Sequence, residues 1–170
     1  MLDIGGASGT YILAFLRKNP TMTAVLFDLE PVVPLARERL KGEGYLDRVT
    51  LISGDLNADE FPAGCDLALL SAIIHMNSPE QNSDLFKRIY RALSPGGVLL
   101  IRDHVMGESR IHPAVGAFFA LNMLVNAMGS DTYTFRKINT ALSNCGFVDI
   151  KLARKGENMG CLVEARKPER

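Results

Sequence analysis

The sequence has few cysteines, no surplus of charge of either sign and no long apolar run. Its three cysteines are scattered and include no CxxC pair, which argues against a disulfide framework and against a zinc site. Nineteen basic and nineteen acidic residues balance, so no overall field attracts nucleic acid or an anionic membrane. Because the sequence shows neither a signal peptide nor an apolar run long enough to cross a bilayer, a cytoplasmic protein with reduced cysteines is expected.

The 170 residues also lack repeats and low-complexity tracts, and a composition of 47% apolar and 22% charged residues is typical of one globular domain, here spanning residues 1–170. Apolar runs alternate with amphipathic segments of helical length. This pattern predicts an α/β fold with a doubly wound, mostly parallel sheet of seven strands that ends in an antiparallel hairpin. The predicted strands are Leu2–Ile4, Thr23–Phe27, Val49–Ser53, Asp66–Ser71, Val98–Arg102, Val148–Leu152 and Gly160–Arg166. The predicted helices are Thr10–Asn19, Val32–Glu43, Pro79–Leu93 and Thr134–Cys145.

One section, Gly107–Gly129, interrupts this alternation. It is rich in Ala, Phe, Leu, Met and Val, and it has almost no charge after His112. Such a composition fits a buried helix, and it equally fits an apolar lid or a helix that faces a partner. The sequence leaves both interpretations open.

The first nine residues carry the clearest local signal. A short apolar strand runs into a turn that contains Gly5, Gly6 and Gly9, and an amphipathic segment follows at once. A strand, a glycine-rich turn and a helix in this order are typical of the edge that holds a nucleotide-like cofactor. Ala7 stands where the dinucleotide fingerprint needs a glycine, whereas the pattern resembles the first motif of S-adenosylmethionine-dependent methyltransferases, with Asp3 as its leading acid. A purely structural turn is the alternative.

Two further acids favour a cofactor site. Asp28 closes the second predicted strand, where a carboxylate can accept hydrogen bonds from both hydroxyls of a ribose. Asp55 closes the third, where it can accept from an adenine amino group. An aspartate after a strand is more often a solvated turn residue, but three acids at the ends of successive strands share the edge where doubly wound folds bind ligands. The neighbours expected at the same cofactor site are Leu29, Gly54, Leu56 and Ser71.

The segment at the end of the fourth predicted strand, Ser71–Glu80, makes the resemblance specific. Over essentially its whole length the chain resembles the catalytic domain of the small-molecule O-methyltransferases, which include plant caffeate and flavonoid enzymes and bacterial hydroxyneurosporene-type enzymes. The resemblance implies a class I (Rossmann-like) methyltransferase fold, S-adenosyl-L-methionine as cofactor, and a small aromatic or polyketide-like acceptor. It also implies that His75 is the general base that deprotonates the acceptor hydroxyl, and that Asp103 supports this base.

Both residues also have ordinary structural interpretations. His75 can cap a helix or pack in the core, and Asp103 can form a salt bridge with Arg102 or Arg110. An imidazole at the ligand edge nevertheless suits the task, because it titrates near neutral pH.

The chain departs from the family pattern in two places. The family's His-Asp-Trp is replaced by His75-Met76-Asn77, and Thr132 stands where the plant members carry a second acid. Acid support of the base is therefore expected to be halved, and the substrates of the plant enzymes cannot be carried over.

Several side chains in the apolar section lie at helical spacing on the expected wall of the acceptor site. A stripe of Met and aromatic residues is more often plain core. The three histidines show no HxxxH spacing, and transfer to oxygen by a general base needs no metal, so no metal is expected. The side chains on this expected wall are Phe118, Phe119, Asn122, Met123 and Asn126, and the last four are the candidate acceptor residues.

Two other functions stay open. Relatives carry an N-terminal helical region that mediates dimerisation and closes the acceptor site. This chain is expected to lack that region, which would weaken a homodimer and leave a truncated, weakly active or inactive fragment. A nicotinamide-binding dehydrogenase half also fits the alternation and Asp28, although Ala7 and Asp55 argue against it.

Overall fold

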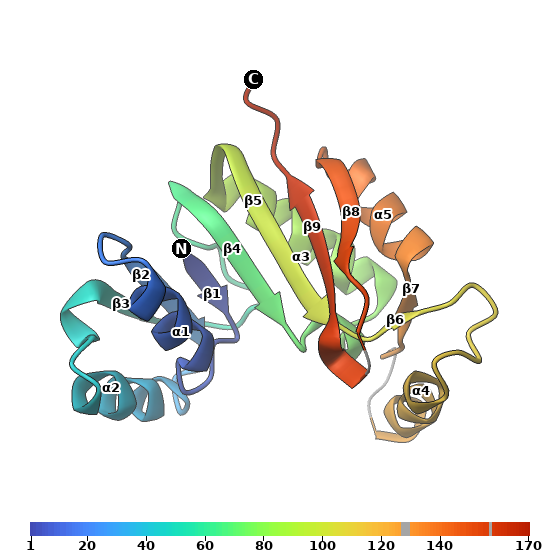
Figure 1. Cartoon of the computed structure of the whole chain (residues 1–170), viewed down its shortest axis with the longest axis horizontal. Helices are drawn as coiled ribbons and strands as arrows, with labels where there is room; N and C mark the ends of the chain where they lie inside the picture. The colour runs from blue at the N-terminus through green and yellow to red at the C-terminus, as the bar shows by residue number, and fades with distance from the viewer. Residues whose placement is uncertain (127–129, 157) are drawn as a thin grey trace.

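The computed structural model describes residues 1–126, 130–156 and 158–170, and the side chains of residues 124–126 lie outside the described set. Its main element is one sheet of seven strands in the order β3-β2-β1-β4-β5-β9-β8 (Figure 1). Strands β1 to β5 pair in parallel, and β9 pairs antiparallel with both β5 and β8. The strands are β1 Leu2–Ile4, β2 Ala24–Asp28, β3 Val49–Ser53, β4 Cys65–Ser71, β5 Leu93–Asp103, β8 Val148–Arg154 and β9 Cys161–Arg166. The predicted fold class is confirmed.

Helices cover both faces of the sheet. On one face, Ile12 of α1 and Leu40 of α2 pack with Leu26 of β2. On the other, Leu85 of α3 and Leu142 of α5 join the larger core, so α1 lies in front of the sheet and α3 and α5 lie behind it (Figure 1). The helices are α1 Thr10–Lys18, α2 Val33–Gly42, α3 Pro79–Ala92, α4 Ala114–Asn126 and α5 Phe135–Asn144. Short 3₁₀ turns cover Leu46–Arg48, Ile74–Met76 and Asn158–Gly160.

Local sequence signals account for where α3 begins. The hydroxyl of Ser78 accepts a hydrogen bond from the backbone N–H of Gln81, and the Gln81 side chain accepts from the Ser78 N–H. This reciprocal cap, with Pro79 at the first helical position, satisfies two backbone donors that a helix start leaves free. The cap therefore fixes the direction in which the preceding turn, Ile74–Met76, leaves the sheet.

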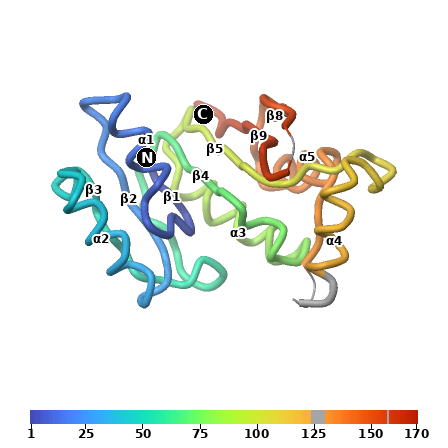
Figure 2. The backbone as a smooth tube through the Cα atoms, turned by 60° about the horizontal axis from the view of Figure 1, so that its bottom comes forward, coloured from blue at the N-terminus to red at the C-terminus, as the bar shows by residue number. Residues whose placement is uncertain are grey.

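The apolar section forms α4, at the end of the molecule opposite α2 (Figures 1 and 2). Its side chains Val115, Phe118 and Leu121 are exposed, with Phe118 at 74%. Of the two interpretations of this section, a buried helix is therefore wrong for the part that the structure describes. No helix among the described residues is both long and apolar enough to span a membrane.

Two features of the sheet differ from the sequence-based expectation. Strand β5 begins at Leu93, five residues before the predicted start, because Leu93 pairs with Cys65 across a register shift at the base of β4. A second, two-stranded sheet joins β6 Val105–Met106 to β7 Tyr133–Thr134 in parallel, and the sequence did not predict it. Both features depend on pairing with segments far away along the chain.

Candidate active site

The carboxyl ends of the five parallel strands meet at one edge of the sheet. Asp28 at the end of β2 is in register with Ser53 of β3, and Ser71 at the end of β4 is in register with Arg102 of β5. Ile4 at the end of β1 lies between Phe27 and Leu70, so the glycine turn leaves the sheet at the centre of this edge. The predicted cofactor residues are therefore collected at one place.

The turn after β1 favours glycine because of its backbone conformation and its close packing. Gly5 has a φ of +69° and donates its N–H to the Phe27 carbonyl at 2.8 Å. A Cβ atom at Gly5 would stand 2.6 Å from Cδ1 of Ile73, in the loop that leads to His75. Gly9, also at positive φ, begins α1. The turn thus packs its backbone directly against the loop that carries the candidate base.

Asp3 lies under this turn without a polar partner. Its side chain is 1% exposed, and neither carboxylate oxygen has a hydrogen-bond partner among the described residues. Burial, and then the nearby Asp28, raise the pKa of Asp3 to about 7. A buried carboxyl with free acceptor oxygens marks a position where a donor from a ligand would be stabilising.

Both carboxylate oxygens of Asp28 accept hydrogen bonds from the backbone. Its Oδ2 accepts the N–H of Ala7 at 2.8 Å, and its Oδ1 accepts the N–H of Leu29 at 2.8 Å. The carboxylate therefore ties the end of β2 to the glycine turn. Each oxygen keeps a second lone pair, so a ribose hydroxyl can still be accepted here.

Asp55 has the geometry of a turn aspartate. It is exposed, and its Oδ1 accepts the N–H of Asn57 at 2.8 Å. Gly54 before it donates its N–H to the Asp28 carbonyl, and a Cβ at Gly54 would meet Cζ of Phe27 at 2.3 Å. Leu29 is half exposed beside the turn, and Leu56 packs against the core. The contacts of these residues with a cofactor stay predictions.

His75 and Asp103 form a buried pair. Nδ1 of His75 lies 2.9 Å from Oδ1 and 3.0 Å from Oδ2 of Asp103, and the two residues are 6% and 1% exposed. Because a carboxylate can only accept, Nδ1 donates in this contact, which leaves Nε2 as the acceptor nitrogen of the neutral ring. Among the described residues, Nε2 makes no hydrogen bond. The ring is thereby held in the tautomer that a general base requires.

Neither arginine that the sequence offered as a partner pairs with Asp103. Arg102 precedes it on β5, and successive side chains of a strand point to opposite faces of the sheet. Arg102 stacks over Tyr11 of α1 on one face, whereas Asp103 reaches His75 on the other. Arg110 forms an ion pair with Asp131 instead.

Three hydrogen bonds from distant segments hold the turn that carries His75. The buried hydroxyl of Tyr133 donates to the Asn77 carbonyl at 2.6 Å, and the Asn82 amide donates to the Ile74 carbonyl at 2.8 Å. The N–H of Asp131 donates to the carbonyl of His75 itself at 3.1 Å. Sequence reasoning missed all three donors, because no local pattern links them to the turn.

Thr132, which occupies the expected place of the second acid, is 1% exposed. Its hydroxyl has no partner among the described residues. Burial raises the pKa of the neighbouring Tyr133 to about 12, so its hydroxyl stays protonated and donates at neutral pH. Because Thr132 is not an acid, Asp103 is the acidic residue that contacts the His75 side chain in the described part of the chain.

A cavity of 530 Å³ adjoins this pair and contains part of the predicted acceptor wall. Phe119 contacts His75 edge-on, with ring centroids 4.9 Å apart, and lies tilted by 33° against the His104 ring, with centroids 4.6 Å apart. Of the candidate acceptor residues, Phe119 and Asn122 line the cavity and Met123 is absent from its lining, while contact of any of them with an acceptor stays a prediction. The side chain of Asn126 lies outside the described residues. The lining residues are Arg102, His104, Val115, Phe118, Phe119, Asn122, Asn158 and Met159.

The lining residues that were not predicted at the site include Arg102 and His104. Burial lowers the pKa of His104, and its Nδ1 has no hydrogen-bond partner among the residues described. The signal that could have found them is their position. Both lie at the carboxyl end of a central strand, beside the predicted Asp103.

The sheet order, the glycine turn and the ligand edge together define a class I S-adenosylmethionine-dependent methyltransferase fold. Residues 1–148 match the O-methyltransferase domain family, and the chain belongs to this family.

Two curated bacterial enzymes are among its relatives. The chain is 30% identical, over 91% of its length, to the 3-hydroxy-5-methyl-1-naphthoate 3-O-methyltransferase of Streptomyces sahachiroi. It is 31% identical, over 88% of its length, to the tetracenomycin polyketide synthesis 8-O-methyl transferase of Streptomyces glaucescens. In both comparisons the chain spans only 44% of the relative.

The structure is also similar to that of human N-acetylserotonin methyltransferase in complex with S-adenosylmethionine. The TM-score is 0.87 at 27% sequence identity, and the match covers 99% of this chain and 47% of the human one. The chain therefore corresponds to less than half of each of these proteins.

Proposed function

We propose that this chain transfers a methyl group from S-adenosyl-L-methionine to a hydroxyl of a small aromatic or polyketide-like acceptor. The observation that carries the proposal is the buried contact between His75 and Asp103, beside a cavity at the edge that also bears the glycine turn. Family membership supports the reaction class, and the polyketide and naphthoate acceptors named for two relatives support the acceptor class.

The residues at the edge fit the cofactor. The orphaned carboxyl of Asp3, which lies under the turn through Gly5 and Gly6, can accept from the ammonium group of the cofactor. Asp28 can accept from the ribose hydroxyls through its remaining lone pairs. When bound, S-adenosylmethionine supplies an electrophilic methyl group on a sulfonium. The further residues proposed to contact it are Gly9, Leu29, Gly54, Asp55, Leu56 and Ser71.

His75 performs the proton transfer in this proposal. Nε2 takes the proton of the acceptor hydroxyl as that oxygen becomes the nucleophile, and the positive charge that develops on the ring is stabilised by the Asp103 carboxylate. A positioned base of this kind accelerates a reaction by about 10²–10⁴-fold. Phe119, in contact with the His75 ring, limits access of water to the same face.

A second candidate function has its own observation. The apolar side chains of α4 are exposed, and Phe118 is also part of the cavity lining. We therefore keep the alternative of a weakly active chain whose α4 needs cover from a further segment, a partner or a second copy of itself.

The test measures binding and turnover separately. Isothermal titration with S-adenosylhomocysteine, with NADH as the matched negative ligand, tests the cofactor. Transfer of labelled methyl to a panel of phenols tests the reaction in the wild type, in His75→Gln and in Met76→Ala, a control in the same turn whose side chain is exposed.

We expect His75→Gln to bind the cofactor product normally and to lose turnover, and Met76→Ala to keep both. Wild-type turnover in His75→Gln would refute His75 as the base. Absence of S-adenosylhomocysteine binding in the wild type would refute the methyltransferase proposal. Binding without turnover on any phenol would favour the weakly active alternative.

A further inference from the structure

Arg102 places a cation between the cofactor edge and the acceptor cavity. It is in register with Ser71 of β4, and its Nη1 donates to the Ser71 hydroxyl at 3.3 Å. Its guanidinium lies over the ring of Tyr11, the second residue of α1, 5.8 Å from the centroid. Arg102 also lines the 530 Å³ cavity next to His104. One side chain thus touches the helix that follows the glycine turn and the cavity beside His75.

The donors of Arg102 are largely unused. A guanidinium has five N–H donors, and Arg102 makes one long hydrogen bond to a neutral hydroxyl and no ion pair with any residue that the structure describes. Two other partly buried arginines show the contrast. Arg48 donates to the carbonyls of Leu16, Asn19 and Met22, and Arg88 donates to those of Asp59 and Asp84.

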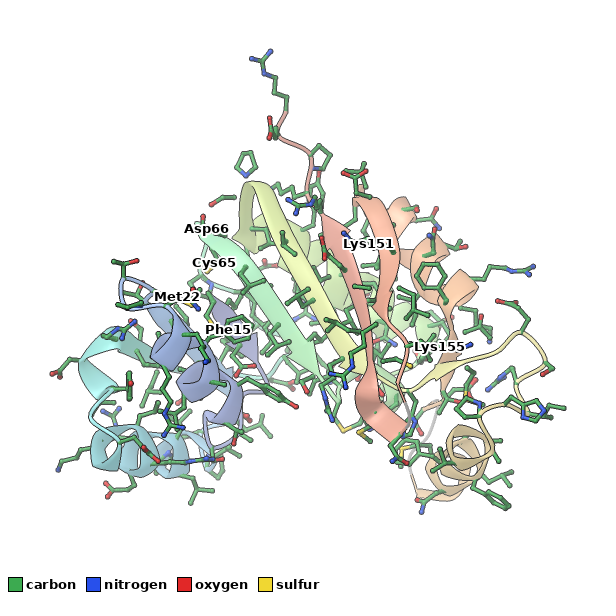
Figure 3. All side chains as sticks on the ribbon, viewed as in Figure 1. Phe15, Met22, Cys65, Asp66, Lys151 and Lys155 are labelled. Carbon is green, nitrogen blue, oxygen red and sulfur yellow. The ribbon has the colours of Figure 1, made fainter. Side chains whose placement is uncertain are left out.

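The face of the sheet that carries Arg102 is accessible. Arg102 and Asp103 point to opposite faces, and only the Asp103 side is covered by α3 and α5. In Figure 3, no α-helix is drawn in front of β5 and β9, the strands that lie between β4, where Asp66 is labelled, and β8, where Lys151 is labelled. A ligand can therefore approach the guanidinium from this side.

A second polar group in the same cavity also lacks a partner. His104 is 4% exposed, and its Nδ1 makes no hydrogen bond to any described residue. Phe119 lies tilted against its ring and also lines the cavity. A half-buried cation with unused donors in the wall of a cavity indicates a position where a polar ligand group would be stabilising.

We infer that Arg102 binds a carboxylate at the junction of the glycine turn and the α4 cavity. A guanidinium matches a carboxylate through two parallel hydrogen bonds, which a neutral ligand group cannot reproduce. The inference rests on the proposed function, and it adds to that function a ligand group that the same site binds. The carboxylate belongs either to the amino-acid end of the cofactor or to an acceptor that is itself an acid.

The test compares two pairs of probes on the wild type, Arg102→Gln and Arg102→Lys. S-Adenosylhomocysteine is compared with 5′-methylthioadenosine, which lacks the carboxylate, by isothermal titration. 4-Hydroxybenzoate is compared with the uncharged 4-hydroxybenzamide by ligand-observed NMR. Arg91→Gln is the matched control, because Arg91 is an exposed residue of α3 paired with Glu60 on the surface. Thermal unfolding of each variant checks the fold, and Arg102→Lys keeps the charge if the glutamine variant is unstable.

If the cofactor supplies the carboxylate, Arg102→Gln weakens S-adenosylhomocysteine binding about 10- to 100-fold and leaves 5′-methylthioadenosine unchanged. If the acceptor supplies the carboxylate, Arg102→Gln weakens binding of 4-hydroxybenzoate and leaves binding of 4-hydroxybenzamide unchanged. In either case Arg102→Lys loses less affinity for the carboxylate ligand than Arg102→Gln does. A folded Arg102→Gln that binds both acids as the wild type does would overturn the inference, as would a wild type that binds neither acid. A wild type that fails to bind S-adenosylhomocysteine refutes the proposed function, and the hydroxybenzoate pair then decides the inference alone.

Discussion

The Nδ1 atom of His75 lies 2.9 Å from Oδ1 of Asp103, and both side chains are buried. His75 comes from the 3₁₀ turn that follows β4, whereas Asp103 is the last residue of β5. Since the two strands are parallel neighbours, their carboxyl ends lie side by side, and residues 28 positions apart come into contact. This contact and the residues around it can be tested by substitution.

Replacing Asp103 with Asn is expected to separate binding from chemistry. The amide can present its NH₂ group to Nδ1, which moves the ring proton to Nε2 and removes the base. Turnover should fall about 10²–10⁴-fold while the affinity for S-adenosylhomocysteine stays at the wild-type value. Methyl-transfer assays and calorimetry measure the two quantities, with Asp84→Asn on the exposed side of α3 as control. Unchanged turnover in Asp103→Asn would contradict a positioning role.

Asp3 is expected to make stability depend on pH. Burial and the nearby Asp28 raise the pKa of Asp3 from 3.8 to about 7. Between these values the folded chain keeps a proton that the unfolded chain has released, so the free energy of unfolding falls as the pH rises through this window. At about pH 8 the ionisation of Asp3 lowers the free energy of unfolding by roughly 4 kcal/mol, since each pKa unit corresponds to about 1.36 kcal/mol.

Asp3→Asn removes this charge. Urea unfolding should show the variant to be more stable than the wild type at about pH 8, with the difference shrinking as the pH falls toward 4. Comparing the two proteins at each pH cancels the titration of all other groups. A pH-independent difference would show that Asp3 is ionised at ordinary pH in the folded chain.

Gly5→Ala is expected to damage both the fold and the cofactor site. The new Cβ would stand 2.6 Å from Cδ1 of Ile73, in addition to the strain of a positive φ. Gly44→Ala is the matched control, because Gly44 has a φ of +76° but no atom lies within 4 Å of the Cβ that alanine would add there. The control should lose about 1–2 kcal/mol of stability from backbone strain alone. Only Gly5→Ala should also weaken S-adenosylhomocysteine binding, and equal effects in both variants would argue against a close approach at Gly5.

Tyr133→Phe is expected to loosen the turn that carries His75. It deletes the hydroxyl that donates to the Asn77 carbonyl at 2.6 Å and leaves a buried acceptor unpaired, at a cost of about 1–3 kcal/mol. Turnover should drop while the KM for the cofactor stays constant, because the glycine turn is untouched. Chemical denaturation and steady-state kinetics measure this, with Tyr45→Phe beside α2 as control. A loss of stability without a loss of turnover would limit Tyr133 to a structural role.

The parts of the fold that were predicted correctly depend on short-range signals. The strand Leu2–Ile4, the turn after it and the start of the helix at Pro79 are set by residues within a few positions of one another. The early start of β5 and the pairing of β6 with β7 were missed, because their partners lie tens of residues away. Backbone hydrogen bonds between distant segments leave no periodic pattern in a single sequence.

The candidate site shows the same division. The alternating pattern placed Asp28, Asp55 and His75 at one edge, because the carboxyl ends of parallel strands must meet there. It could not decide whether Asp103 pairs with His75 or with an arginine. That choice depends on which face of β5 each side chain takes and on how the turn after β4 bends back toward it.

The sequence by itself therefore determined the α/β architecture, the glycine turn and the edge that binds ligands. These follow from the alternation of apolar runs with amphipathic segments of helical length and from the glycines that follow the first strand. The tertiary structure alone decided that Asp103 holds His75, that Tyr133 and Asn82 hold its turn, and that Arg102 is left without an acidic partner among the described residues. Each of these depends on contacts between segments that meet only when the strands pair and the helices pack against the sheet.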